Sequence, residues 1–229
     1  MGVKVFEGLN YLPMEIKNDI IRTCGGGNYQ EKPNTYSLTN VLGCLRQAYY
    51  QKTLPRPPET VQSCYAKYRG ILFDEKWTSL FRHNQVRCTY RCKSIPITIS
   101  GKYDFITNTD PPVLTDLKTR EKLESLTSPI YSHIKQVRFY AYCNSIHHAQ
   151  LIYVNLETCK VFPIEVGNVQ PLLDEIEERA YRLYMAFLTN TIPPMEESGL
   201  CSYCNYQTTC NPPKLQKEKE KQAQEALRV

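Results

Sequence analysis

The sequence lacks several features that would place it in a class at once. It contains no apolar run approaching the ~20 residues of a membrane-spanning helix, and its start, MGVKVFEGLN, does not combine a basic segment with an apolar core. We therefore expect a soluble, cytoplasmic protein with no membrane partner. No Gly-x4-Gly-Lys-Ser/Thr loop occurs, so ATP-driven helicase chemistry is not expected. No repeat of fixed period occurs, which argues against solenoids and propellers.

A large excess of one charge is also missing. The 28 Lys and Arg against 23 Asp and Glu leave a net charge of only +5 over 229 residues, so a polyanionic partner is tolerated but not required. Tyrosine and cysteine are abundant, with 17 and 10 copies. In a reducing compartment, cysteines are better explained as metal ligands or buried apolar residues than as a disulfide framework.

The hydrophobic periodicity predicts a mixed α/β domain between two less regular ends. We expect helices over roughly 37–54, 62–81, 130–141 and 172–187, and strands over roughly 95–99, 103–107, 113–117, 151–155 and 161–166. Residues 1–36 form a weakly patterned arm, to which we assign no chemistry.

The predicted hairpin carries residues suited to metal-dependent phosphodiester chemistry. Asp116 and Lys118 are two positions apart in a strand and therefore share one face. Asp104, on the preceding strand, reaches the same place if the strands pair across the turn at 108–112. Two such carboxylates suit Mg²⁺ or Mn²⁺, and a metal-activated water beside a lysine is a means of cleaving phosphodiesters. An exposed hairpin with surface Asp and Lys is the simpler alternative.

The next predicted helix offers two polar side chains to the same cleft. Gln136 and Tyr140 are four positions apart and so stand together on one helix flank. They could contact nucleic acid or the catalytic groups, although a surface helix with a half-buried tyrosine would give the same pattern.

Basic residues alternate with tyrosines between the first two predicted helices, which favours a single-stranded DNA surface of charge and stacking. We expect about half of these tyrosines to pack in the core. The residues are Arg46, Tyr49, Tyr50, Lys52, Arg56, Tyr65, Lys67, Tyr68 and Arg69.

Three cysteines fall within ten residues near the C-terminal end: Cys201, Cys204 and Cys210. Packing alone explains this density poorly. A four-coordinate site needs a fourth ligand, for which Cys44 is the leading candidate, and either Zn²⁺ or an iron–sulfur cluster (2Fe–2S or 4Fe–4S) would suit such thiolates. The remaining cysteines are interpreted as buried apolar residues. They are Cys24, Cys64, Cys88, Cys92, Cys143 and Cys159.

Taken in order, these motifs resemble the CRISPR-associated RecB-like exonucleases, the Cas-four family of the PD-(D/E)XK nuclease superfamily. The joint order, over roughly residues 37–213, is far more specific than any one motif. The motifs are Cys44, Gly70 with Asp74 and Glu75, Gly101-Lys102-Tyr103-Asp104, Asp116-Leu117-Lys118, Gln136 with Tyr140, and Cys201, Cys204 and Cys210.

The resemblance implies a restriction-endonuclease-like mixed β-sheet flanked by helices, with a small helical iron–sulfur subdomain built from both chain ends. It makes Asp104 and Asp116 metal ligands, Lys118 the catalytic lysine, and Gln136 with Tyr140 a helical motif of the active site. The four cysteines would hold the cluster. The implied activity is metal-dependent cleavage of single-stranded DNA ends before their insertion as CRISPR spacers, alongside the spacer integrase.

The resemblance also implies a division of the chain. Residues 1–60 would form the arm and the helical part of the iron–sulfur subdomain, 61–190 the nuclease core, 191–213 the cysteine segment, and 214–229 a charged tail.

One position departs from the family. Where its members commonly carry His four residues after the motif glycine, this chain has Asp74, followed by Glu75. A carboxylate still binds a hard cation, so Asp74 is expected to be the third metal ligand. Glu75, about 100° further round the helix, is its rival.

A second function remains open at this stage. The chain could be a non-catalytic nucleic-acid-binding or adaptor module, with solvated hairpin carboxylates and a zinc site. Iron content and metal-dependent cleavage of single-stranded DNA separate it from the exonuclease.

Overall fold

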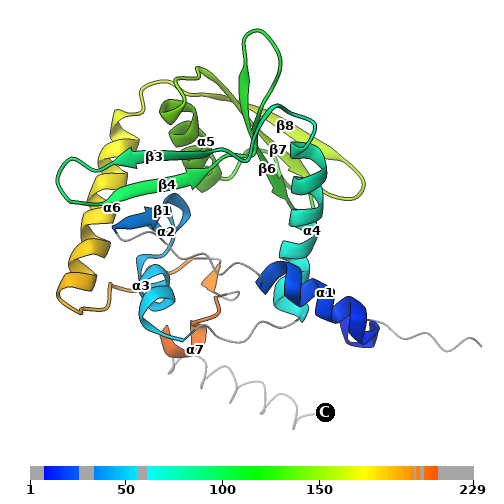
Figure 1. Ribbon diagram of the computed structural model, residues 1–229, viewed down its shortest axis with the longest axis horizontal. Coiled ribbons are helices and arrows are strands. Elements are labelled where there is room, and N and C mark those ends of the chain that lie inside the picture. The colour runs from blue at the N-terminus through cyan, green and yellow to red at the C-terminus, as the bar shows by residue number, and fades with distance from the viewer. Residues whose placement is uncertain (1–7, 26–33, 56–60, 199, 202–203, 211–229) are drawn as a thin grey trace, which may run out of the picture.

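Two mixed sheets form the body of the protein (Figure 1). The structure is a computed structural model that describes residues 8–25, 34–55, 61–198, 200–201 and 204–210. The larger sheet has the order β2-β5-β6-β7-β8, and only its β6 and β7 strands pair in parallel. The smaller sheet has the order β1-β4-β3, with β1 parallel to β4. The strands are β1 Thr35–Ser37, β2 His83–Asn84, β3 Arg87–Arg91, β4 Thr98–Lys102, β5 Phe105–Ile106, β6 Val113–Thr119, β7 His148–Val154 and β8 Cys159–Glu165.

Helices flank these sheets, which confirms the predicted mixed α/β class. In Figure 1, α4 runs beside the larger sheet toward α1, while α6 lies along the smaller one. None of the helices in the described ranges is both long and apolar enough to span a membrane. The helices are α1 Met14–Gly25, α2 Leu38–Leu42, α3 Leu45–Thr53, α4 Val61–Thr78, α5 Tyr131–Cys143, α6 Gln170–Leu188 and α7 Gln207–Cys210, with a 3₁₀ turn η1 at Leu9–Tyr11.

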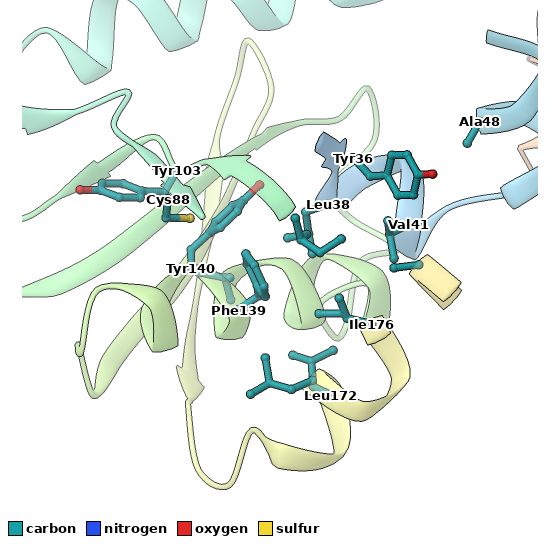
Figure 2. Packing of buried hydrophobic residues seen from close by; sticks show 14 of the residues in the cluster. Tyr36, Leu38, Val41, Ala48, Cys88, Tyr103, Phe139, Tyr140, Leu172 and Ile176 are labelled. Atoms are coloured by element: carbon teal, nitrogen blue, oxygen red, sulfur yellow. The ribbon is translucent and has the colours of Figure 1, made fainter. Parts of the chain in front are cut away.

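The main core lies where α5 packs against both sheets and against α6. Figure 2 shows Phe139 and Tyr140 of α5 beside Ile176 of α6 and Leu38 of α2. All four side chains are buried. Because α5 is held on three sides, its polar flank is fixed relative to β6.

The predicted helix over 37–54 is in fact two helices. Ser37 caps the first, accepting a hydrogen bond from the Asn40 backbone N–H at 3.1 Å. That helix ends at Gly43, where a Cβ would lie 2.7 Å from the Thr39 carbonyl oxygen. Cys44, in extended backbone, then precedes α3 as its N-cap residue. Because of this break, Cys44 does not lie on the apolar face of one continuous helix, as the predicted helix implied.

The N-terminal arm contains a helix that the sequence pattern did not reveal. Within α1, Ile20 is buried while Met14 and Ile16 are exposed. The apolar stripe is therefore narrow, because α1 packs mainly against one neighbour, α4. The charged tail predicted at 214–229 lies outside the described residues.

Candidate active site

A cavity of about 430 Å³ opens between α4, the β5–β6 hairpin and α5. Its lining brings together five of the residues that the sequence singled out: Asp74, Asp104, Asp116, Lys118 and Gln136. These side chains come from two helices, α4 and α5, and from the β5–β6 hairpin, so the fold, and not sequence proximity, assembles them.

Strand β6 supplies an ion pair to this cavity. Lys118 Nζ lies 2.7 Å from Asp116 Oδ2, as their shared strand face predicts. Burial works against the charged form of Lys118, but the carboxylates of Asp116 and Asp104 outweigh it and raise its pKa. Lys118 therefore stays an ammonium in the cavity. Asp116 is almost completely buried, and burial raises its pKa while Lys118 opposes the rise.

Asp104 reaches the same place across the hairpin. The β5–β6 pairing sets Phe105 opposite Thr115, and the backbone N–H of Leu117 donates a hydrogen bond to Asp104 Oδ2. Burial, then the neighbouring charge of Asp116, raises the pKa of Asp104 to about 8. Because burial is the main cause of this rise, Asp104 favours its neutral form unless a cation lies beside it.

Asp74 enters from α4. Gly70, one turn earlier, lets the helix approach β6, since a Cβ there would lie 3.1 Å from Thr119 Oγ1. Burial raises the pKa of Asp74; Lys102 opposes this rise and Asp116 adds to it. Glu75 is exposed to solvent and is not part of the cavity lining. The geometry thus favours Asp74 over Glu75 at this position.

Gln136 and Tyr140 share a hydrogen bond but not an environment. Gln136 Nε2 donates to the Tyr140 hydroxyl at 2.8 Å, and Gln136 lines the cavity. Tyr140 was expected to face the cleft, but its ring is buried in a slot over Gly101, which has no Cβ to fill it. Tyr140 therefore supports Gln136 from the core side.

Two residues at the site were missed by sequence reasoning. Gln85 donates from Nε2 to both carboxylate oxygens of Asp74, at 2.8 and 2.9 Å. No sequence pattern marks Gln85, because it follows a strand of only two residues. His133 lines the cavity and precedes Gln136 by three positions, so helical spacing could have found it. Its Nδ1 lies 2.9 Å from the Tyr153 hydroxyl.

The sequence was compared with known protein families. The PD-(D/E)XK nuclease superfamily matches residues 37–211, about three quarters of the chain. The chain belongs to the PD-(D/E)XK nuclease superfamily. No curated protein matches the sequence significantly.

Solved structures give the fold of this superfamily member a second line of comparison. The crystal structure of SSO0001 is similar, with a TM-score of 0.68 and 17% identity, over 86% of this chain and 97% of that one. An alkaline exonuclease from Laribacter hongkongensis aligns with a TM-score of 0.42 and 10% identity, over 76% of this chain and 96% of its own. At this identity, the SSO0001 likeness speaks for the fold alone.

Nucleases of the PD-(D/E)XK superfamily use divalent metals such as Mg²⁺ or Mn²⁺. Within the described ranges, no three or more His, Cys, Asp or Glu side chains are arranged closely enough to hold a metal ion. In its chemistry the donor set fits a hard cation, because Asp74, Asp104 and Asp116 all bring carboxylate oxygens to the lining of one cavity. A divalent ion would add positive charge beside these carboxylates, to which Lys102 and Lys118 already contribute.

The four candidate cluster ligands lie in or near two short helices, with Cys44 at the start of α3 and Cys210 at the end of α7. In Figure 1, α3 and α7 lie beside each other below the smaller sheet. Burial raises the pKa of Cys204, and the neighbouring thiols of Cys44, Cys210 and Cys201 raise it further. Arg46 Nη1 contacts Cys210 Sγ at 3.7 Å, which ties α3 to the C-terminal segment.

The other cysteines include both packing and surface residues. Cys64, Cys88 and Cys92 are buried, as the apolar interpretation predicts, whereas Cys24 and Cys143 are partly buried. Cys159 is exposed on β8, so that interpretation is wrong for it.

The predicted surface of basic residues and tyrosines is only partly a surface. Tyr49 and Tyr50 are buried, and Tyr49 donates a hydrogen bond to Asn190 Oδ1 at 2.8 Å. Arg46 donates to the Pro193 carbonyl at 2.7 Å. Arg46 therefore contacts the cysteine segment, and neither of the two tyrosines faces solvent. Arg56 lies outside the described residues.

Proposed function

We propose that this protein is a metal-dependent DNA exonuclease that degrades single-stranded DNA from its ends. The observation that carries the proposal is the convergence of Asp74, Asp104 and Asp116 with Lys118 on one cavity. Superfamily membership supports nuclease chemistry for these residues.

The chemistry follows from the charges of the residues. A bound Mg²⁺ or Mn²⁺ would lower the pKa of a coordinated water and polarise the scissile phosphate. Asp74, Asp104 and Asp116 would hold the ion. Lys118 would orient the attacking water and offset the negative charge that develops on the phosphate. Gln136, backed by Tyr140, would donate a hydrogen bond to the substrate from the α5 side.

The cysteine end of the molecule would have a structural role. We propose that Cys44, Cys201, Cys204 and Cys210 hold an iron–sulfur cluster that joins the helical segment of residues 1–60 to the segment of residues 191–213. The order of the motifs along the chain supports the further proposal that the enzyme prepares DNA for CRISPR spacer insertion. Its partner would be the spacer integrase.

A cleavage assay tests the activity. Linear single-stranded DNA labelled at one end is incubated with Mg²⁺, Mn²⁺ or EDTA, with circular single-stranded DNA as the control substrate. Stepwise shortening of the linear strand alone, and only with metal, is expected. Asp116→Asn should abolish it, whereas Asp174→Asn, on an exposed site of α6, should not. Equal cutting of the circle would show an endonuclease, and no cutting with either metal would refute the nuclease proposal.

Metal analysis and co-purification test the remaining parts. Iron and acid-labile sulfide in the purified protein are expected, with a brown colour. Zinc in their place, together with an inactive hairpin, would favour the adaptor module. The spacer integrase from the same genome should be retained on the immobilised protein, and its free passage would contradict the assignment to spacer processing.

A further inference from the structure

Gln85 forms hydrogen bonds with the carboxylates of the candidate active site from outside the cavity. It follows β2 and is not part of the cavity lining. Its side-chain amide donates to Asp74 Oδ1 at 2.8 Å and Oδ2 at 2.9 Å, and approaches Asp104 Oδ1 at 3.4 Å. Its backbone N–H donates to the Asp104 carbonyl oxygen at 2.8 Å. One residue thus fixes two acidic residues from different elements, α4 and the turn before β5.

Two features of Gln85, its backbone conformation and its unpaired side-chain oxygen, each cost folding free energy. Its backbone has a φ of 51°, a left-handed conformation that residues other than glycine seldom adopt. Its Oε1 atom is buried without a hydrogen-bond partner among the described residues, whereas buried polar atoms are nearly always paired. Such features persist only where the surroundings impose them, and they concentrate at functional sites.

The orientation of the amide is set by charge. Rotating the amide by 180° would place Oε1, a hydrogen-bond acceptor, against the carboxylate oxygens of Asp74 and Asp104. Ionised carboxylate oxygens are acceptors too, so these contacts would be repulsive. The donor orientation is therefore retained even though it leaves Oε1 unpaired. The carboxylates, and not the fit of Oε1, decide how Gln85 lies.

Two carboxylates aimed at one place repel each other and tend to move apart or take up protons. A neutral donor behind them can hold them together without occupying the cavity or competing for its charge. A lysine in this position would neutralise the carboxylates and compete with a cation, whereas an amide does neither.

We propose that Gln85 is a positioning residue that holds the Asp74 and Asp104 carboxylates together for a divalent cation. The proposal rests on the proposed function, because it requires a cation at these carboxylates. Gln85 does not touch the substrate and is no catalytic residue. Its loss acts through the geometry of Asp74 and Asp104, so the first property to change is metal affinity.

Calorimetric titration of the whole protein with Mn²⁺ tests this without any activity assay. Gln85→Leu removes the donor and is expected to weaken Mn²⁺ binding about 10- to 100-fold, the usual effect of losing a residue that orients metal ligands. The matched control is Gln170→Leu, because Gln170 Nε2 also donates to a carboxylate, Asp174, but on the exposed face of α6. The control should bind Mn²⁺ with wild-type affinity.

The outcomes separate this proposal from the proposed function. Wild-type affinity in Gln85→Leu, with binding abolished in Asp116→Asn, would overturn the role of Gln85 and leave the metal site standing. No Mn²⁺ binding by the wild-type protein, or unchanged binding in Asp116→Asn, would overturn both.

A measurement on the unmodified protein does not depend on the folding of a variant. In ¹⁵N-resolved spectra, the Gln85 side-chain amide protons should exchange with solvent more slowly than those of Gln170, and should shift when Mg²⁺ is added while those of Gln170 do not. Equally fast exchange of the two amides, or a Gln85 signal indifferent to saturating Mg²⁺ that the calorimeter detects, would refute the positioning role.

Discussion

Lys118 Nζ lies 2.7 Å from Asp116 Oδ2, in a cavity that Asp74 and Asp104 also line. Asp116 is buried, so the pair exists only because each side chain neutralises the other. Breaking a buried pair by removing one partner leaves the remaining charge uncompensated. Lys118 is therefore expected to matter for both chemistry and stability.

Lys118→Ala should lower the rate of metal-dependent cleavage by about 10²- to 10³-fold, because it removes a positive group that acts on developing charge. DNA binding should persist, since one lysine near the scissile phosphate acts mainly in the transition state. Single-turnover cleavage and fluorescence anisotropy measure the two effects. The same variant should melt at lower temperature in EDTA and regain part of the loss with Mg²⁺. Cleavage at the wild-type rate would return Lys118 to the role of a surface charge.

Asp74→Ala should reduce metal-dependent cleavage strongly, because Asp74 is the only acidic residue of α4 in the cavity lining. Glu75→Ala is the matched control, since Glu75 is the adjacent acid but lies exposed. It should cleave as the wild type does. Comparison of initial rates in Mg²⁺ and Mn²⁺ decides between them, and the opposite result would move the ligand to Glu75.

Asp74→His should retain activity but shift its preference from Mg²⁺ toward Mn²⁺. An imidazole replaces a hard oxygen ligand with nitrogen, which Mn²⁺ accepts more readily than Mg²⁺ does. The ratio of cleavage rates in the two metals measures the shift. An unchanged ratio would mean that the side chain at position 74 does not contact the ion.

Four strands of the larger sheet, β5 to β8, and the helices α4, α5 and α6 could be predicted from the sequence, because period-two and helical patterns follow directly from one-sided burial. β1 and β2 were not predicted, and of the strand expected over 95–99 only Thr98 and Ile99 lie in β4. The convergence of Asp104 with Asp116 followed from the hairpin alone. The contribution of Gln85 could not be found in this way, since it depends on α4 and the turn before β5 meeting in space. The same holds for Tyr140, whose burial depends on Gly101 in a strand of the other sheet.

Cys204→Ser should lower iron content and melting temperature together. The thiols of Cys44, Cys201 and Cys210 act on the pKa of Cys204, so under the proposal its loss removes a ligand that connects α3 to the C-terminal segment. Cys159→Ser, on the exposed face of β8, is the control and should change neither quantity. Iron analysis and thermal unfolding on the same samples make the test. A variant without bound metal but with the wild-type melting curve would show that no cluster joins these segments.

The pH dependence of stability should carry a signature of His133. Burial, then Lys118 and Arg120, lowers its pKa to about 4 from an ordinary value of 6.5. The unfolded chain therefore binds a proton that the folded protein refuses, and stability is lost as pH falls from 6.5 toward 4. Over the whole window the loss is about 3 kcal/mol, at 1.36 kcal/mol for each pKa unit.

His133→Gln removes this titration while keeping a polar side chain beside Tyr153. Between pH 7 and pH 5, the wild-type protein should lose about 2 kcal/mol more unfolding free energy than the variant. Urea denaturation at the two pH values measures this difference, and comparing the two proteins cancels the titration of groups they share. His147→Gln, at an exposed histidine, should keep the wild-type dependence. Equal losses in the wild type and His133→Gln would mean that the ring takes up its proton in the folded protein and is not held neutral beside Lys118.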